Sequence, residues 1–303
     1  MAAALFAAVV ASVVAFAAPP SSNHLAITTL SSRPDAVSGG DVVVRIGVPA
    51  NAPLSHVEVA LNGVDVSSVF LPDAASHALV GLVPGLVEGE NVLTASTRQT
   101  NPSLRAALKL RNSPKHGPVF SGPHQRPWVC ETLASGLGAP PASGPCVVQS
   151  RYDWFYRTTA GTFAPLASPS SLPADLATTT TIDGNVVNYI VRVESGTINE
   201  SIYRISILDD PTNPISNPWS AGGTRPGTGW NRKLHVPFGG GCGPAFRSGR
   251  NAVTSALVHD SLSLGFGVAF GTRNTLGNGC NLVVSAETLA MIKEHFVEQY
   301  GFP

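Results

Sequence analysis

The stretch KLHVPFGGGCGPAF, from Lys233 to Phe246, decides how the second half of the chain is interpreted. An apolar run over residues 234–238 has the character of a buried strand and leads directly into Gly239, Gly240 and Gly241. Glycine tolerates every backbone conformation and lets a ligand come close to backbone N–H groups. Such a loop is typical of an oxyanion hole, in which these N–H groups stabilise a negatively charged oxygen. A glycine-rich surface turn is the alternative that the loop alone leaves open.

The segments around this loop predict a sheet with helices. Residues 188–195 and 200–208 have strong strand character and are separated by a short turn, which favours an antiparallel pair. After the glycine loop, residues 251–264 suit a helix and residues 265–271 a short buried strand. Together with a final helix, this order is that of the first half of an α/β-hydrolase sheet.

The final helix is predicted from Ser285, its expected N-cap, to Gly301. Glu287 lies in its first turn, where the helix dipole explains an acidic residue. His295 is expected at the surface. The spacing places an apolar face opposite a polar one: Leu289, Ile292, Phe296 and Tyr300 against Lys293, Glu294 and Glu298.

The N-terminal half has a different pattern. Residues 24–111 contain short alternating runs divided by turn signals, including Asn62-Gly63, and predict six or seven strands in an immunoglobulin-like β-sandwich. Residues 112–127 are rich in proline and glycine and are expected to form a linker or entry segment. The second domain is expected over 117–303, so that the two segments overlap. The predicted fold class is therefore mixed, a sandwich followed by half of an α/β-hydrolase-like domain.

Composition limits the classes of function. The chain has 303 residues, a formal net charge of zero and no cluster of Lys or Arg, which argues against nucleic acid as a partner. Residues 1–20 are apolar, end in small residues and Pro19-Pro20, and are expected to be a signal peptide. We therefore expect a secreted, periplasmic or extracellular protein with no stable membrane insertion after cleavage. A retained membrane anchor is the alternative.

Four cysteines lie in the second half of the chain, at 130, 146, 242 and 280. In an exported protein an even number favours disulfides, and four cysteines allow three connectivities. The simplest pairs Cys130 with Cys146 and Cys242 with Cys280. No CxxC spacing is present, so neither a zinc site nor any other metal or cofactor is expected.

No residue of the chain is identified as a catalytic nucleophile. A G-x-S-x-G elbow places a serine on a sharp strand-to-helix turn, and the serines at 135, 143, 195 and 248 do not fit that pattern. His259, Asp260 and Ser261 are adjacent within a predicted helix and point in different directions, so they do not form a triad. His235 is expected to be a packed, satisfied histidine.

Four segments carry a family resemblance: RPWVCET (126–132), VRVESGTINESIYRISILDDP (191–211), the FGGGCG loop (238–243) and GNGCNLVVSAETLAMIKEHFVEQYG (277–301). Together they resemble a bacterial secreted family of unknown function related to tannase and feruloyl-esterase-like α/β-hydrolases. The resemblance covers about residue 117 to the end. It implies a serine ester hydrolase, with a small-molecule or polymeric ester as the partner of the full-length protein.

Within that resemblance only Gly239, Gly240, Gly241 and Cys242 correspond to an active-site element, the oxyanion-hole side. The family's serine elbow follows the helix that ends this chain, and its acid and histidine follow later, so the nucleophile is expected beyond residue 303. We therefore expect an N-terminal fragment of an ester hydrolase-like protein that is inactive alone. The alternatives are a non-enzymatic secreted binding or surface module, or a truncated gene product without activity.

Overall fold

A computed structural model describes residues 23–303 except 99–101, 222, 224–228 and 244–245. The expected signal peptide lies outside the described residues. The described chain is a mixed structure dominated by β-sheets, with two α-helices, α1 (His259–Leu262) and α2 (Leu282–Tyr300). Short 3-10 helices occur at Leu54–His56, Ser67–Val69, Leu133–Ser135, Val253–Ala256, Thr272–Asn274 and Leu276–Asn278.

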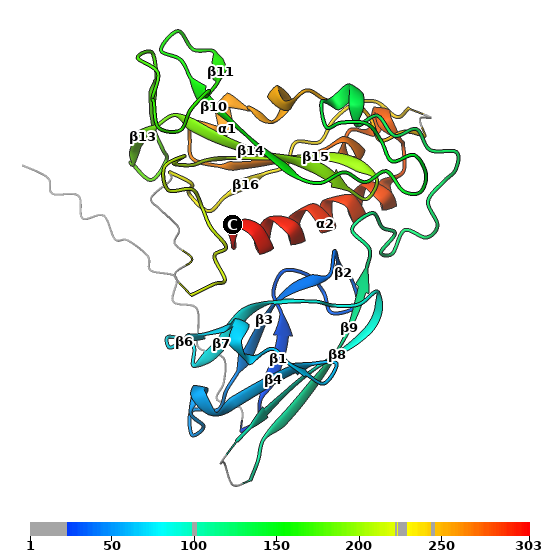
Figure 1. Ribbon diagram of the computed structural model, residues 1–303, viewed down its shortest axis with the longest axis vertical. Coiled ribbons are helices and arrows are strands. Elements are labelled where there is room, and N and C mark those ends of the chain that lie inside the picture. The colour runs from blue at the N-terminus through cyan, green and yellow to red at the C-terminus, as the bar shows by residue number, and fades with distance from the viewer. Residues whose placement is uncertain (1–22, 99–101, 222, 224–228, 244–245) are drawn as a thin grey trace, which may run out of the picture.

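The N-terminal region contains two sheets that share one hydrophobic core (Figure 1). The first has the order β1 (Ala26–Thr29), β3 (Asp41–Gly47), β7 (Ala78–Pro84), β6 (Phe70–Asp73). The second has the order β2 (Val37–Ser38), β9 (Arg105–Ser113), β8 (Gly89–Thr97), β4 (Val57–Leu61), β5 (Val64–Asp65). Buried side chains of both sheets, such as Val44, Ile46, Val59 and Leu93, belong to the same cluster.

Strand β4 shows why these residues form strands. Val57, Val59 and Leu61 alternate with more exposed neighbours, so one face of the strand enters the core. The turn to β5 uses Asn62 and Gly63 at φ 50° and 85°, left-handed values that these two residues tolerate best. The hairpin predicted at this dipeptide is confirmed.

The second region is built on a six-stranded sheet in the order β11 (Phe163–Pro165), β10 (Arg151–Arg157), β14 (Ile190–Ile198), β15 (Ser201–Leu208), β17 (Gly267–Gly271), β16 (Leu234–His235). All neighbours are antiparallel except β16 and β17, which are parallel. Every residue of β14 and β15 is buried, which makes this predicted antiparallel pair the centre of the region. A separate pair, β12 (Thr178–Thr180) and β13 (Val186–Asn188), lies outside this sheet.

Helix α2 lies between the six-stranded sheet and the N-terminal sheets (Figure 1). Phe296 and Tyr300 pack with Tyr203 and Ile205 of the six-stranded sheet, as their spacing predicts. The opposite face carries polar residues, as the spacing predicts, but two of the three are buried. Glu294 and Glu298 there are 2% and 3% exposed and contact the N-terminal region instead.

Two helix predictions are wrong in their bounds, because side chains form hydrogen bonds with backbone groups there. The expected helix over 251–264 is reduced to the short α1 and one 3-10 turn. Two of its carbonyl groups accept hydrogen bonds from β15 side chains instead, Asn251 O from Arg204 and Ala256 O from Ser206. Helix α2 begins earlier than predicted, because Asn281 and not Ser285 caps it by accepting from the N–H groups of residues 283 and 284.

Candidate functional site

The glycine loop follows the edge strand β16 and lies along residues 275–280. Leu276 N–H donates to Gly239 O at 2.9 Å, and Cys280 N–H donates to Gly243 O at 3.2 Å. A disulfide between Cys242 and Cys280 adds a covalent link between the same two segments. The backbone of the loop is therefore held from one side, and its other side is open.

The open side presents backbone donors. Residues 239–242 are exposed, and within the described chain the N–H groups of Gly240 and Gly241 donate to no acceptor. Gly240 has a left-handed φ of 85°, whereas a Cβ added to Gly241 would meet no atom within 4 Å. The loop thus offers two unpaired N–H groups at an exposed surface, and backbone N–H donors of this kind form oxyanion holes.

A cavity of about 700 Å³ borders this loop, within the range of small-molecule sites. Trp128, Phe246 and Val284 supply apolar walls, while His124 and Arg273 supply the cationic ones. Cys242 and Gly243 also line it, so the cavity reaches the end of the glycine loop.

A buried polar cluster lies behind the cavity, at the hairpin turn between β14 and β15. Asn199 and Glu200 form this turn with φ values of 53° and 54°, and both are fully buried. Left-handed backbone is uncommon for a glutamate and is often retained where a site must be shaped. Sequence analysis recognised the turn but not its burial.

Glu200 is neutralised by several donors. Its carboxylate accepts from Arg126 at 2.8 Å, from His124 at 2.9 Å and from the N–H of Cys146 at 3.0 Å. Burial acts to raise the pKa of Glu200, but these hydrogen bonds outweigh it and hold the pKa at about 2.

Glu287 accepts hydrogen bonds from three successive backbone N–H groups. One carboxylate oxygen accepts from the N–H groups of Val119, Phe120 and Ser121 at 2.8, 2.6 and 2.7 Å. Burial again acts to raise the pKa of Glu287, yet the nearby His124, whose Nε2 lies 3.9 Å from Oε1, and the hydrogen bonds from residues 120 and 121 lower it to about 2. Glu287 therefore fixes a cavity wall to helix α2, and the helix dipole expected from sequence is not its main role.

His124 lies between these two glutamates. Burial acts to lower its pKa, but the hydrogen bond to Glu200 and the proximity of Glu287 prevail, and the pKa is raised. Its Nε2 is buried 3.9 Å from Glu287 Oε1 and has no hydrogen-bond partner among the described residues. The two glutamates therefore favour the protonated ring.

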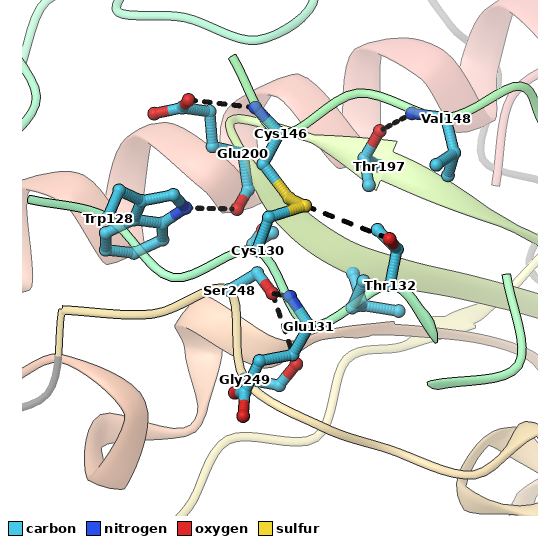
Figure 2. The surroundings of a disulfide bond; sticks show 12 residues. Trp128, Cys130, Glu131, Thr132, Cys146, Val148, Thr197, Glu200, Ser248 and Gly249 are labelled. Atoms are coloured by element: carbon cyan, nitrogen blue, oxygen red, sulfur yellow. Dashed lines mark hydrogen bonds between the residues drawn. A yellow bond between two sulfur atoms is a disulfide. The ribbon is translucent and has the colours of Figure 1, made fainter. Parts of the chain in front are cut away.

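The segment that brings Trp128 to the cavity is held by the second disulfide, Cys130–Cys146 (Figure 2). Trp128 Nε1 donates to Glu200 O at 3.2 Å, and the N–H of Glu131 donates to Ser248 Oγ at 2.8 Å. Each disulfide joins a cysteine to the next cysteine along the chain, Cys130 to Cys146 and Cys242 to Cys280. The first wall of the cavity and the glycine loop are thus each tied by one disulfide.

The remaining candidates do not assemble into a triad. His235 Nδ1 bonds Ser261 Oγ at 2.7 Å, but no carboxylate among the described residues bonds its other nitrogen. His259 contacts Tyr189 at 3.2 Å. His295 is not a surface residue as expected, because Nε2 binds Glu194 at 2.7 Å. The buried Ser195 accepts from Arg204, and Ser248 holds residue 131.

These features agree with what the comparison with protein families shows. A model of a tannase-like family of unknown function matches residues 27–303. The chain belongs to this tannase-like family, which relates it to esterases at the level of the family. No curated protein matches the chain. Of the helices in the described part of the chain, none is long and apolar enough to cross a membrane, and the two disulfides are compatible with an extracellular location.

Proposed function

We propose that the chain is the N-terminal portion of a secreted carboxylic-ester hydrolase, an immunoglobulin-like sandwich followed by the first half of an α/β-hydrolase-like domain. In this proposal Gly240 and Gly241 donate their N–H groups to the oxyanion formed when a serine attacks the ester carbonyl. The serine, its histidine and its acid lie beyond residue 303. The substrate is an ester that reaches the loop through the adjoining cavity.

The observation that carries the proposal is the pair of unpaired, exposed N–H groups in the glycine loop that follows β16. Strand order supports it, since an antiparallel pair, β14 and β15, is followed by β17 and then by the parallel edge strand β16. In a sheet of this type the glycine loop after the third strand faces the nucleophile elbow. Membership in the tannase-like family supports ester chemistry in particular.

The test uses Gly241→Val in the chain extended through its downstream reading frame. A Cβ added at residue 241 meets no atom within 4 Å apart from its chain neighbours, so the variant should fold and obstruct only the ligand. We expect hydrolysis of an aryl ester to fall about 10²–10³-fold, the usual cost of one oxyanion donor. A serine-reactive phosphonate should label a serine after residue 303.

Ala252→Val is the matched control, because it also places a valine at an exposed, extended position outside the loop. It should retain full activity. Hydrolysis that survives Gly241→Val unchanged, or a labelled serine within the described residues, would refute the oxyanion role. A downstream reading frame without such a serine would favour the binding-module alternative.

A further inference from the structure

The guanidinium of Arg273 is fixed in place with most of its donors unused. Nε donates to Asn199 O at 3.1 Å, and the group stacks over the Trp128 ring with 4.1 Å between Cζ and the ring centroid. Neither Nη atom has a hydrogen-bond partner in the described chain, and Nη2 is fully shielded from solvent. A buried cation with unmet donors is costly unless a partner arrives.

The nearby carboxylates do not supply that partner. Glu200 is satisfied by Arg126, His124 and a backbone N–H, and Glu287 by the backbone of residues 119–121. Arg273 forms no ion pair with any described carboxylate, although it lines the cavity. Its role is therefore not explained by the cluster behind it.

The cavity surface has one sign of charge. Among the described residues, His124 and Arg273 line it, and no Asp or Glu does. Helix α2 begins at this cavity, since Asn281 and Val284 line it, and the N-terminus of a 19-residue helix adds positive potential. Burial lowers the pKa of Arg273 to about 10 against the opposing pull of Glu200 and Glu287, so the guanidinium remains charged at neutral pH.

We propose that this cavity binds the anionic group of an organic molecule, a carboxylate or a phosphate, on the guanidinium of Arg273. The guanidinium gives either anion charge-assisted hydrogen bonds. Nη1 is the donor that remains for them, since Nε is bound to Asn199 O and Nη2 is shielded. His124 adds a second cation at the cavity, and Trp128 and Phe246 accept the apolar part of the ligand. The site goes beyond the proposed hydrolysis, because it binds its ligand whether or not the glycine loop serves catalysis.

The experiment is calorimetric titration of the chain with benzoate, phenyl phosphate and neutral benzamide. The three probes share the aryl group and differ in charge, so they separate recognition of the anion from apolar packing. We expect saturable binding of at least one anion at millimolar concentration or below and none of benzamide. The stronger anion identifies the source, carboxylate or phosphate.

Arg273→Gln should weaken binding of that anion by about tenfold or more, because a neutral amide cannot replace the charged fork. Arg105→Gln is the matched control; it removes an exposed guanidinium from strand β9 and should bind as the parent does. Phe246→Ala, at a side chain 44% exposed, should weaken binding without affecting folding.

Three results would overturn the proposal: no binding of either anion, equal binding of benzamide, or unchanged affinity in a folded Arg273→Gln variant. If Arg273→Gln does not fold, the comparison of benzoate with benzamide in the parent chain still decides the outcome. Because calorimetry measures binding without turnover, failure here is distinct from failure of the proposed hydrolysis.

Discussion

The two ends of helix α2 carry buried glutamates in opposite electrostatic states. Near the N-terminus, Glu287 is surrounded by backbone donors, and its pKa is lowered to about 2. Near the C-terminus, Glu294 and Glu298 face the N-terminal sheets, and burial, together with the charge of Asp41, raises the pKa of both well above the usual carboxyl range. Asp41 itself has a pKa raised mainly by burial.

Burial alone does not explain this difference, because the three glutamates are 0%, 2% and 3% exposed. What differs is the number of donors. Among the described residues, Glu287 accepts from three N–H groups, a serine hydroxyl and Asn199. Glu294 accepts from the N–H and hydroxyl of Ser38, and Glu298 accepts from Ser31 and lies near other acids. Hydrogen bonding thus favours the ionised carboxylate at one end of α2, and burial favours the protonated carboxyl at the other.

The largest effect is expected from Glu287→Ala. The change leaves the N–H groups of residues 119–121 and the amide of Asn199 without their acceptor. We expect the free energy of unfolding in urea at pH 7 to fall by about 3 kcal/mol, as for removal of one partner of a buried charged group. Glu287→Gln keeps one acceptor oxygen and should cost less. A loss no greater than that of an exposed control such as Lys293→Ala would contradict the comparison.

Near the C-terminus of α2, replacing a buried glutamate should raise the free energy of unfolding instead of lowering it. Since the pKa of Glu298 is raised in the folded state, the folded protein binds more protons there than the unfolded chain. The contribution of Glu298 to the free energy of unfolding is complete below 4.5, the pKa of this carboxyl in the unfolded chain. It is lost as the pH rises above that value toward the pKa of the folded state. Glu298→Gln cannot ionise, so it should be more stable than the parent at pH 8, by about 1–2 kcal/mol.

Urea denaturation between pH 2 and 9 measures this effect and the opposite one of Glu287. The parent should lose stability toward high pH, and Glu298→Gln should show a flatter curve. Glu287 should have the opposite effect, because its pKa is lowered. Its contribution to the free energy of unfolding is present above pH 4.5 and is lost as the pH falls toward about 2. Parallel pH curves for the parent and Glu298→Gln would show that Glu298 is not protonated in the folded state.

The same contrast explains which parts of the fold the sequence predicts. Strands such as β4, β14 and β15 follow from local alternation or apolar runs, and the apolar face of α2 follows from helical spacing. The spacing also predicts the polar face of α2 but not its burial, because periodicity cannot show that residues 31–41 contact it. A second layer from a distant segment turns polar residues into buried ones.

For the candidate site, the sequence predicts the glycine loop, since three successive glycines after a strand are a local signal. It does not predict the cluster of Glu200, Glu287 and His124, whose members come from three separate segments. One feature of the sequence could have predicted the burial of Asn199 and Glu200. They form a two-residue turn between two predicted strands, and when both strands are wholly buried the turn that joins their ends is buried as well.

The smallest effect tests how Glu294 is held against the N-terminal sheets. Its carboxylate accepts from the hydroxyl and the N–H of Ser38, at 2.5 and 3.0 Å, and both bonds act to lower a pKa that burial raises. Ser38→Ala removes only the hydroxyl, so unfolding at pH 5 should cost about 1 kcal/mol less than in the parent. The deficit should grow at pH 8, because the ionised carboxylate then loses a charge-assisted bond. Thr28→Val, which removes an exposed hydroxyl from β1, should show no such pH dependence; an equal deficit at both pH values would mean that Glu294 does not change its charge between them.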